Sequence, residues 1–172
     1  MMTKTRTHKT RTRKKGTLIF FCGKMGAGKS TKARALTEAQ NLILIAEDEW
    51  LAALYPGQIN SPQDYKTYAD RLKEPIKSMV QSCLNAGLDV VMDFPANTPG
   101  QRQWLKSVAD DISAPHQLYV LDRDDETCLQ HIAARALAEP ARADTDTPEM
   151  FYAMKPYFSL PQDDEGLTVI KS

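Results

Sequence analysis

Short apolar runs alternate with longer segments of helical character along the chain after residue 16. The apolar runs are 17–22 (TLIFFC), 42–46 (LILIA), 89–94 (DVVMDF) and 116–121 (HQLYVL), followed by a shorter one at 166–170 (GLTVI). Continuous apolar runs of this length are typical of strands that are buried on both faces of a parallel sheet. The alternation therefore predicts one α/β domain over residues 16–172, in which helices flank a parallel sheet.

The segments between these runs predict helices. Their ranges are 30–41, 63–85, 100–109 and 124–139, and in the second of them Leu72, Ile76, Met79, Val80 and Cys83 recur at helical spacing. Pro75 lies inside that segment and predicts either a kink or two separate helices. Residues 140–150 (PARADTDTPEM) interrupt the periodicity and predict an exposed loop.

Residues 23–31 read GKMGAGKST and lie between the first apolar run and the first predicted helix. Gly23, four residues, and then Gly28, Lys29 and Ser30 match the pattern of a P-loop. Backbone N–H groups of such a loop surround phosphate oxygens at a helix N-terminus. Lys29 would reach the β- and γ-phosphates, and the Ser30 hydroxyl would ligate Mg²⁺. The motif predicts that ATP binds to Gly23, Lys24, Met25, Gly26, Ala27, Gly28, Lys29, Ser30 and Thr31.

Acidic residues follow two of the other apolar runs. Asp93 comes after VVM and fits the Walker-B position, which holds Mg²⁺ directly or through water, while Asp48 and Asp89 compete for this role. A kinase also needs a group that accepts the proton of the acceptor hydroxyl. Asp48, in the sequence AEDEW, is the predicted base, with Glu47 and Glu49 as alternatives.

Two arginines lie seven residues apart near the end of the last long predicted helix. Arg135 is on the helix and Arg142 is in the predicted loop. This placement predicts a small helical lid that brings guanidinium groups to the phosphates, with a solvated face as the alternative. Arg102 is a weaker candidate for substrate contact, because it lies one turn into the predicted helix that follows Asp93 and could face the cleft.

The charges are unevenly distributed, although the chain has 22 basic and 22 acidic residues. The first fifteen residues hold seven Lys or Arg and no acid, so the remainder has 15 basic against 22 acidic residues, a net charge of −7. A body of this charge is not typical of a general nucleic-acid-binding protein. Residues 1–15 predict a disordered basic arm, with polyanion binding as the alternative.

The cysteines and histidines predict no further chemistry. Cys22, Cys83 and Cys128 are widely spaced and odd in number, which favours free thiols in a reducing cytoplasm over disulfides or a metal site. His8, His116 and His131 have no metal-ligand spacing and are predicted to lie in the arm, at a strand start and on a helix surface. No apolar run approaches the roughly 18 residues of a membrane-spanning helix, so we expect a soluble, cytoplasmic protein.

Four segments, in this order, resemble the small P-loop kinases, which include zeta toxins, chloramphenicol phosphotransferase, gluconate kinase and the kinase domain of polynucleotide kinase. They are GKMGAGKST, LILIAEDEWLAALYP, GLDVVMDFPANTPGQRQWL and CLQHIAARALAEPAR, and the resemblance extends from Thr17 to about Ile170. The chain looks most similar to bacterial proteins described as ATP-binding or AAA-family proteins. It has no separate sensor segments or second domain that would suggest a ring.

The resemblance implies a P-loop NTPase fold, with a five-stranded parallel sheet and the P-loop strand at its centre. It assigns phosphate binding to Lys29 and Ser30, lid functions to Arg135 and Arg142, and a role as base or substrate anchor to Asp48. The chain is much shorter than zeta toxins and lacks the phosphatase domain of some polynucleotide kinases, so the acceptor stays open.

The sequence therefore predicts an ATP- and Mg²⁺-dependent phosphotransferase that moves the γ-phosphoryl group to a hydroxyl of a small molecule, as a monomer or homodimer. Residues 55–65 (YPGQINSPQDY) are the expected site of acceptor specificity. Two alternatives remain: the acceptor is the 5′-hydroxyl of a nucleic acid steered by the basic arm, or the protein is a nucleotide-dependent switch that acts on a protein partner.

Overall fold

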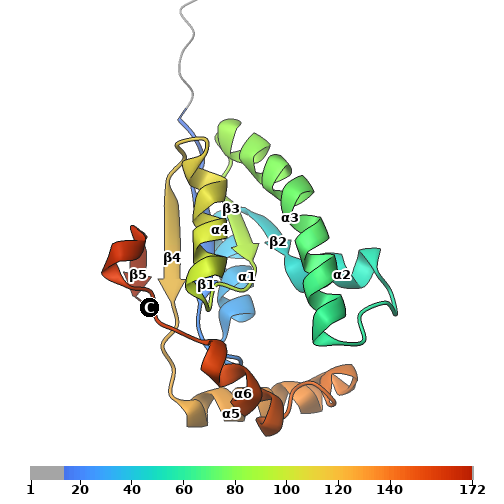
Figure 1. Cartoon of the computed structure of the whole chain (residues 1–172). Helices are drawn as coiled ribbons and strands as arrows, with labels where there is room; N and C mark the ends of the chain where they lie inside the picture. Colours follow the sequence, from blue (N-terminus) through green and yellow to red (C-terminus); the bar gives the residue numbers. More distant parts are fainter. Residues whose placement is uncertain (1–13, 172) are drawn as a thin grey trace, which may run out of the picture.

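Five parallel strands form a single sheet at the centre of the computed structural model, which describes residues 14–171. The strands are β1 (Leu18–Cys22), β2 (Ile43–Ala46), β3 (Val90–Asp93), β4 (His116–Val120) and β5 (Val169–Lys171). Their order in the sheet is β2-β3-β1-β4-β5, so β1, which leads into the P-loop, is central (Figure 1). The predicted fold class and the central position of the P-loop strand are confirmed.

Helices cover both faces of the sheet and its carboxyl edge. They are α1 (Lys29–Gln40), α2 (Glu47–Leu54), α3 (Pro62–Asn85), α4 (Pro99–Asp110), α5 (Asp125–Ala138) and α6 (Pro148–Met154), with short 3-10 turns η1 (Pro140–Arg142), η2 (Lys155–Tyr157) and η3 (Asp163–Glu165). In Figure 1, α4 lies in front of the sheet and α1 behind it, while α5 and α6 lie below the carboxyl ends of the strands. The P-loop follows β1, Asp48 follows β2 and Asp93 ends β3, so these predicted site residues lie at the carboxyl ends of the strands.

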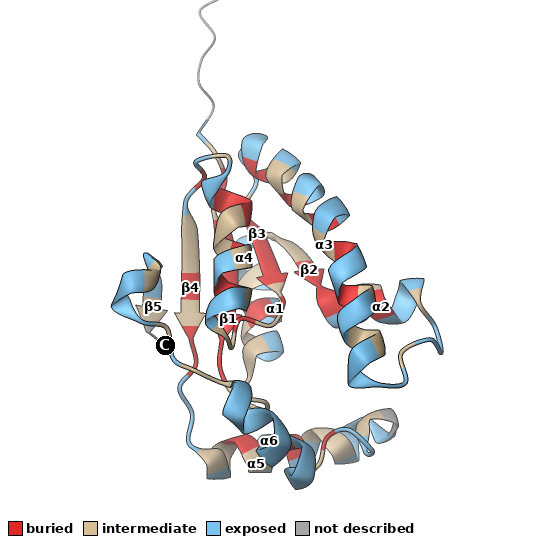
Figure 2. Cartoon of the chain, viewed as in Figure 1, coloured by how far each residue is buried: buried red, intermediate tan, exposed pale blue. Residues whose placement is uncertain are grey.

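The two faces of β1 pack into two different cores. Leu18 and Phe20 contact the core beneath α3 and α4, whereas Ile19 and Phe21 pack with residues of α1, α5 and α6. All five side chains of β1 are buried, because successive residues of a strand point to opposite faces and both faces are covered. Buried residues accordingly concentrate along the central strands and the inward sides of the helices (Figure 2).

Two predicted boundaries differ in the structure. Pro75 lies within a single helix, α3. Pro75 is exposed, whereas Leu72 and Ile76 of the same helix are buried. The predicted exposed loop 140–150 is wrong in part: η1 lies at its start and α6 begins at Pro148, where the Thr147 hydroxyl caps the backbone N–H of Met150.

Most of the predicted basic arm lies outside the described residues. Of the arm, only Lys14 and Lys15 are described, and the Lys15 ammonium donates to the carbonyl of Ile112. Among the helices of residues 14–171, none is both long and apolar enough to cross a membrane.

Candidate active site

The P-loop connects the central strand to α1 through a backbone that requires glycine. Gly26 and Gly28 have φ values of 76° and 94°, in the left-handed region that favours glycine. A Cβ atom on Gly26 would also lie 2.4 Å from the carbonyl oxygen of Cys128 in α5. Gly28 is the N-cap of α1 and provides no side chain to cap its first N–H groups, which are therefore available to an anion.

Lys29 places its ammonium inside this loop. Nζ donates to the carbonyl oxygens of Gly23 at 2.5 Å and Lys24 at 3.0 Å. Burial lowers the pKa of Lys29, and the negative charge of Asp93 acts in the opposite direction. The ammonium thus lies where phosphate oxygens in the loop would be within its reach.

Three contacts from distant parts of the chain fix the position of the loop. Asn97 Oδ1 accepts a hydrogen bond from Gly23 N at 3.1 Å, and His131 Nδ1 lies 2.8 Å from the carbonyl oxygen of Gly26. The Lys24 ammonium pairs with Asp125 at 2.6 Å. His131 is on the helix surface as predicted, but its contact with the P-loop was missed, because no local pattern relates α5 to a loop about one hundred residues earlier.

Asp93 and Ser30 are the predicted ligands of a divalent cation, and the structure places Asp93 at the end of β3 and Ser30 in the first turn of α1. Asp93 ends β3, in register with Ala46 of β2, and its charge influences Lys29. Asp89 is excluded from this role, because its Oδ1 accepts a hydrogen bond from Thr17 N just before β1. This contact lies at the amino ends of the strands, away from the P-loop. Within residues 14–171 no cluster of three His, Cys, Asp or Glu residues is placed to hold a metal alone. The oxygen donors present fit Mg²⁺, which one or two protein oxygens hold together with phosphates.

The structure separates the three acids that follow β2. Glu49 is exposed and pairs with Arg34, whereas Glu47 is buried and accepts from the Tyr65 hydroxyl. Asp48 keeps contact with solvent, yet the surrounding protein removes enough water to raise its pKa. The charges of Arg142, Arg135 and Lys29 oppose that shift, while the charge of Asp93 adds to it. Asp48 is therefore the acid whose environment includes both the P-loop and the predicted lid.

Glu47 gives stability a dependence on pH that a substitution can test. Burial raises its pKa from an ordinary 4.5 to about 7, although the Tyr65 hydroxyl acts in the opposite direction. Because the folded state holds this proton more tightly, the contribution to stability is present below pH 4.5 and is lost as the pH rises through 7. We expect Glu47→Gln to raise the free energy of unfolding by about 3 kcal/mol at pH 8 and to change it little at pH 4.

Urea unfolding of wild type and variant at several pH values measures this difference. Glu49→Gln is the control, since Glu49 is exposed and should show no such dependence. An equal gain at every pH would mean that the packing of Gln, rather than the charge of Glu47, causes the effect.

The two predicted lid arginines meet on one buried carboxylate. Arg135 binds Asp146 through two hydrogen bonds, Nε to Oδ2 at 2.5 Å and NH2 to Oδ1 at 2.7 Å. Arg142 Nε donates to the same Oδ2 at 3.3 Å. The sequence interpretation missed Asp146, because it assigned this segment to an exposed loop.

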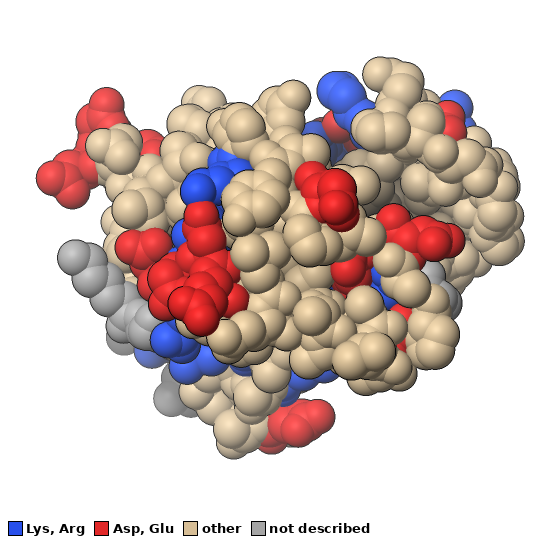
Figure 3. All heavy atoms as spheres, turned by 90° about the horizontal axis from the view of Figure 1, so that it is seen from below, with Lys and Arg blue, Asp and Glu red and all other residues tan. Residues whose placement is uncertain are grey.

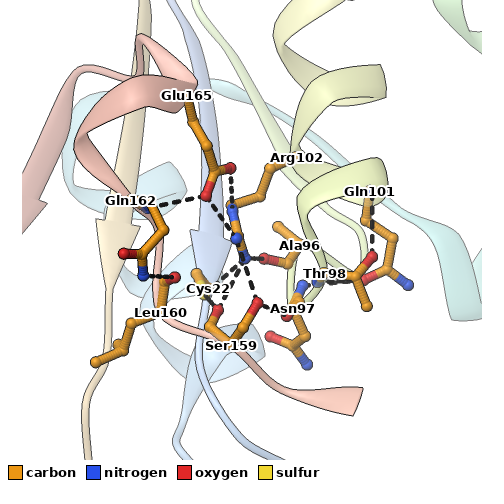
Figure 4. Close-up of polar contacts among 10 residues, drawn as sticks. All are labelled: Cys22, Ala96, Asn97, Thr98, Gln101, Arg102, Ser159, Leu160, Gln162 and Glu165. Carbon is orange, nitrogen blue, oxygen red and sulfur yellow. Dashed lines mark hydrogen bonds and ion pairs between the residues drawn. The ribbon is translucent and has the colours of Figure 1, made fainter.

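Arg102 does not face the cleft, and this prediction was wrong. Its side chain is fully buried and pairs with Glu165 through Nε at 2.7 Å and NH2 at 2.8 Å. NH1 donates to the carbonyl oxygens of Ala96 and Ser159 (Figure 4). Ser159 N in turn donates to Asn97 O, so Arg102 ties the segment after α6 to the residue that holds Gly23. Arg102 therefore has a structural role: through Ser159 and Asn97 it supports the backbone of the P-loop at Gly23.

The face that carries α5 and α6 is not a continuous basic surface. Figure 3 views the molecule from this side and shows acidic side chains in several groups, with basic side chains scattered among them. A protein that tracks a nucleic-acid backbone typically presents a gathered basic patch.

A glycine-rich loop between a central parallel strand and a helix, with Lys29 inside it, defines a P-loop NTPase. Residues 18–161 match the sequence model of a family described as an AAA domain, and the chain belongs to this family.

Known proteins with similar sequence or structure include several kinases. The adenylate kinase of Prochlorococcus marinus (strain MIT 9211) is 29% identical over 129 residues, which cover 70% of this chain and 69% of that protein. A candidate kinase from Chloroflexus aurantiacus j-10-fl has a TM-score of 0.71 at 15% identity and covers 92% of this chain and 85% of its own. The APS kinase of Mycobacterium tuberculosis, solved with AMPPNP and APS, has a TM-score of 0.60 at 16% identity and covers 92% and 90%. Family and fold support nucleotide-dependent phosphoryl transfer.

Proposed function

We propose that the protein is an ATP- and Mg²⁺-dependent kinase that transfers the γ-phosphoryl group to a hydroxyl of a small molecule. One observation carries this proposal: the P-loop with Lys29, Asp48 just after β2 and Asp93 at the end of β3 lie at the carboxyl ends of the parallel strands. The charges of Lys29, Asp93, Arg135 and Arg142 accordingly act on Asp48. An acid that can receive a proton thus lies within electrostatic range of the groups that would hold the phosphates. Such convergence is what phosphoryl transfer to an alcohol requires.

Each residue has a defined role in this proposal. ATP would lie on Gly23–Thr31, with Mg²⁺ held by Ser30 and Asp93, and the bound metal would neutralise phosphate charge. Lys29 would bind the β- and γ-phosphate oxygens, and Asp48 would orient the acceptor hydroxyl and accept its proton. Arg135 and Arg142 would stabilise the charge on the transferring group. Positioning and charge stabilisation supply the rate acceleration in such reactions.

The acceptor would bind beside α2 and α3. Residues 55–61 of the segment 55–65 join these helices, and its last residue, Tyr65, lies in the first turn of α3 and contacts Glu47 next to the proposed base. Tyr55 at its start packs against Tyr68, with ring centroids 4.2 Å apart. These contacts support a role for the segment in shaping the acceptor site.

Two other functions are less well supported. A polynucleotide 5′-hydroxyl kinase would need a basic track, whereas basic side chains are scattered on the face in Figure 3. A nucleotide-dependent switch that acts through a protein partner has no evident need for an acid placed as Asp48 is, near Lys29 and the lid arginines.

A screen for acceptor-dependent ADP formation tests the proposal against both alternatives. The protein is incubated with Mg²⁺-ATP and, separately, sugars, aminoglycosides, chloramphenicol, nucleosides and 5′-hydroxyl oligonucleotides. We expect one of the small molecules to increase ADP formation above the rate in water. Stimulation by oligonucleotides alone would favour the polynucleotide kinase, and no stimulation by any acceptor would favour the switch.

Asp48→Asn tests the assignment of the base. We expect kcat to fall by about 10²–10⁴-fold, because the amide cannot accept the proton, while the affinity for ATP changes little. Steady-state kinetics and ATP titration measure the two effects, and Glu49→Gln serves as the neighbouring control. Unchanged turnover in Asp48→Asn would remove this assignment and leave Glu47, the buried one of the three acids, as the next candidate.

A further inference from the structure

Asp146 is a buried acid at the turn between η1 and α6. Its side chain is only 1% exposed, and its backbone N–H donates to the carbonyl oxygen of Arg142 at 2.7 Å. A carboxylate so far removed from water is costly unless it is paired. Both of its oxygens accept from arginines, so its charge is compensated entirely within the lid segment.

Asp146 binds a particular edge of each arginine. It takes Nε and NH2 of Arg135 and Nε of Arg142. No described group hydrogen-bonds to NH1 of Arg135 or to NH1 and NH2 of Arg142, whose other ion pair, with Glu139, is through Nε at 3.9 Å. Each guanidinium therefore keeps terminal N–H donors that a phosphoryl oxygen could use.

This arrangement removes conformational freedom before a ligand binds. An unpaired arginine loses rotamer entropy when it is fixed, and a planar two-bond contact fixes both its position and its orientation in advance. Two guanidinium groups on the carboxylate of Asp146 leave one positive charge in excess, since the other acidic neighbour, Glu139, is exposed and 3.9 Å from Arg142 Nε. Arg142 is the strongest of the cationic influences on Asp48, so this charge lies toward the proposed reaction site.

We propose that Asp146 is a positioning residue for phosphoryl transfer: it holds Arg135 and Arg142 by their Nε edges so that their free N–H groups reach the transferring phosphoryl. This inference rests on the proposed function but assigns a residue outside the P-loop and the acceptor site. Asp146 itself contacts no phosphate. The competing explanation is that Asp146 only holds the lid segment together.

Asp146→Asn separates these explanations, with Asp144→Asn as the matched control because Asp144 is exposed two residues earlier. The amide keeps an oxygen acceptor but loses the charge and places an NH2 against a guanidinium. We expect kcat to fall by about 10–100-fold, with the affinity for a non-hydrolysable ATP analogue changed less than threefold. The acid limb of the pH–kcat profile should move to higher pH, since Arg142 would no longer be held near Asp48. The Asp144→Asn values should equal those of wild type.

Two further measurements keep the inference testable. If Asp146→Asn does not fold, Asp146→Glu retains the charge on a side chain one methylene longer, and a folded variant with reduced kcat would support positioning. A melting temperature that falls while kcat and the pH profile match wild type, in either variant, would overturn it.

Mg²⁺-dependent ATP hydrolysis in water is measured in parallel for all variants. If wild type phosphorylates no acceptor, the proposed function fails, but the arginines would still act on the phosphoryl group during hydrolysis. A reduced hydrolysis rate in Asp146→Asn would then still support the positioning role, and an unchanged rate would contradict it.

Discussion

Lys29→Ala is expected to lower phosphoryl transfer by at least about 10²–10³-fold, the cost of removing a preorganised donor from a buried site. The Lys29 ammonium is held by two loop carbonyls, and no other lysine in the P-loop is free to replace it, because Lys24 pairs with Asp125. Without this cation, the charge that develops on the γ-phosphate would lack its nearest compensation. Initial rates at saturating ATP measure the loss.

Lys32→Ala is the matched control for Lys29→Ala. Lys32 lies one turn further along α1, with Nζ 5.9 Å from the ring centroid of Tyr119. Its removal should leave the rate within about twofold of wild type. Comparable losses in both variants would indicate damage to α1, and an unchanged rate in Lys29→Ala would contradict the phosphate-binding role of the loop.

Arg102→Ala is expected to cost about 3–5 kcal/mol of stability, because it leaves Glu165 without its partner and empties a fully buried space. It also leaves the carbonyl oxygens of Ala96 and Ser159 without the donor that satisfies them. Denaturant unfolding measures the loss. Nucleotide affinity should weaken as well, since the segment that holds Asn97 against Gly23 is no longer tied down.

Arg71→Ala is the control for this prediction, because Arg71 is exposed and lies over the Tyr68 ring at 5.1 Å. Its effect on stability should stay below about 0.5 kcal/mol. Had Arg102 contacted substrate, Arg102→Ala would instead retain wild-type stability and lose turnover. That combination of results would contradict the structural role of Arg102 and support its contact with substrate.

The fold was predictable because its strands are buried on both faces. A continuous apolar run such as that of β1, followed by a P-loop and a helix, is typical of a buried strand of a parallel sheet. The alternation of strands and helices along the rest of the chain predicted the other strands of the same sheet. The boundary at Pro75 was not predictable, because whether a proline interrupts a helix depends on the packing around it.

The position of Arg102 was within reach of the sequence. In α4 the buried residues are Arg102, Leu105, Val108 and Ala109, which share one helical face. Its place one turn into the helix that follows Asp93 suggested the cleft, whereas the apolar periodicity that includes position 102 points to the core. The periodicity was the more reliable signal, because the spacing of the apolar residues identifies which face of α4 is buried, and position 102 lies on that face.

The contacts of Asp146, Asn97 and His131 were beyond sequence reasoning. Each depends on how separate elements meet, as when His131 of α5 reaches Gly26. The choice among Glu47, Asp48 and Glu49 also required the structure, because three consecutive helix residues point in different directions.

Transfer of labelled γ-phosphate from ATP to an acceptor tests the central claim most directly. The acceptors that increase ADP formation are incubated with γ-labelled ATP and Mg²⁺, with Lys29→Ala as the blank, and the products are separated. We expect a labelled small molecule that forms with wild type and is absent with Lys29→Ala. Label found only in free phosphate, at the same rate with every compound, would contradict it.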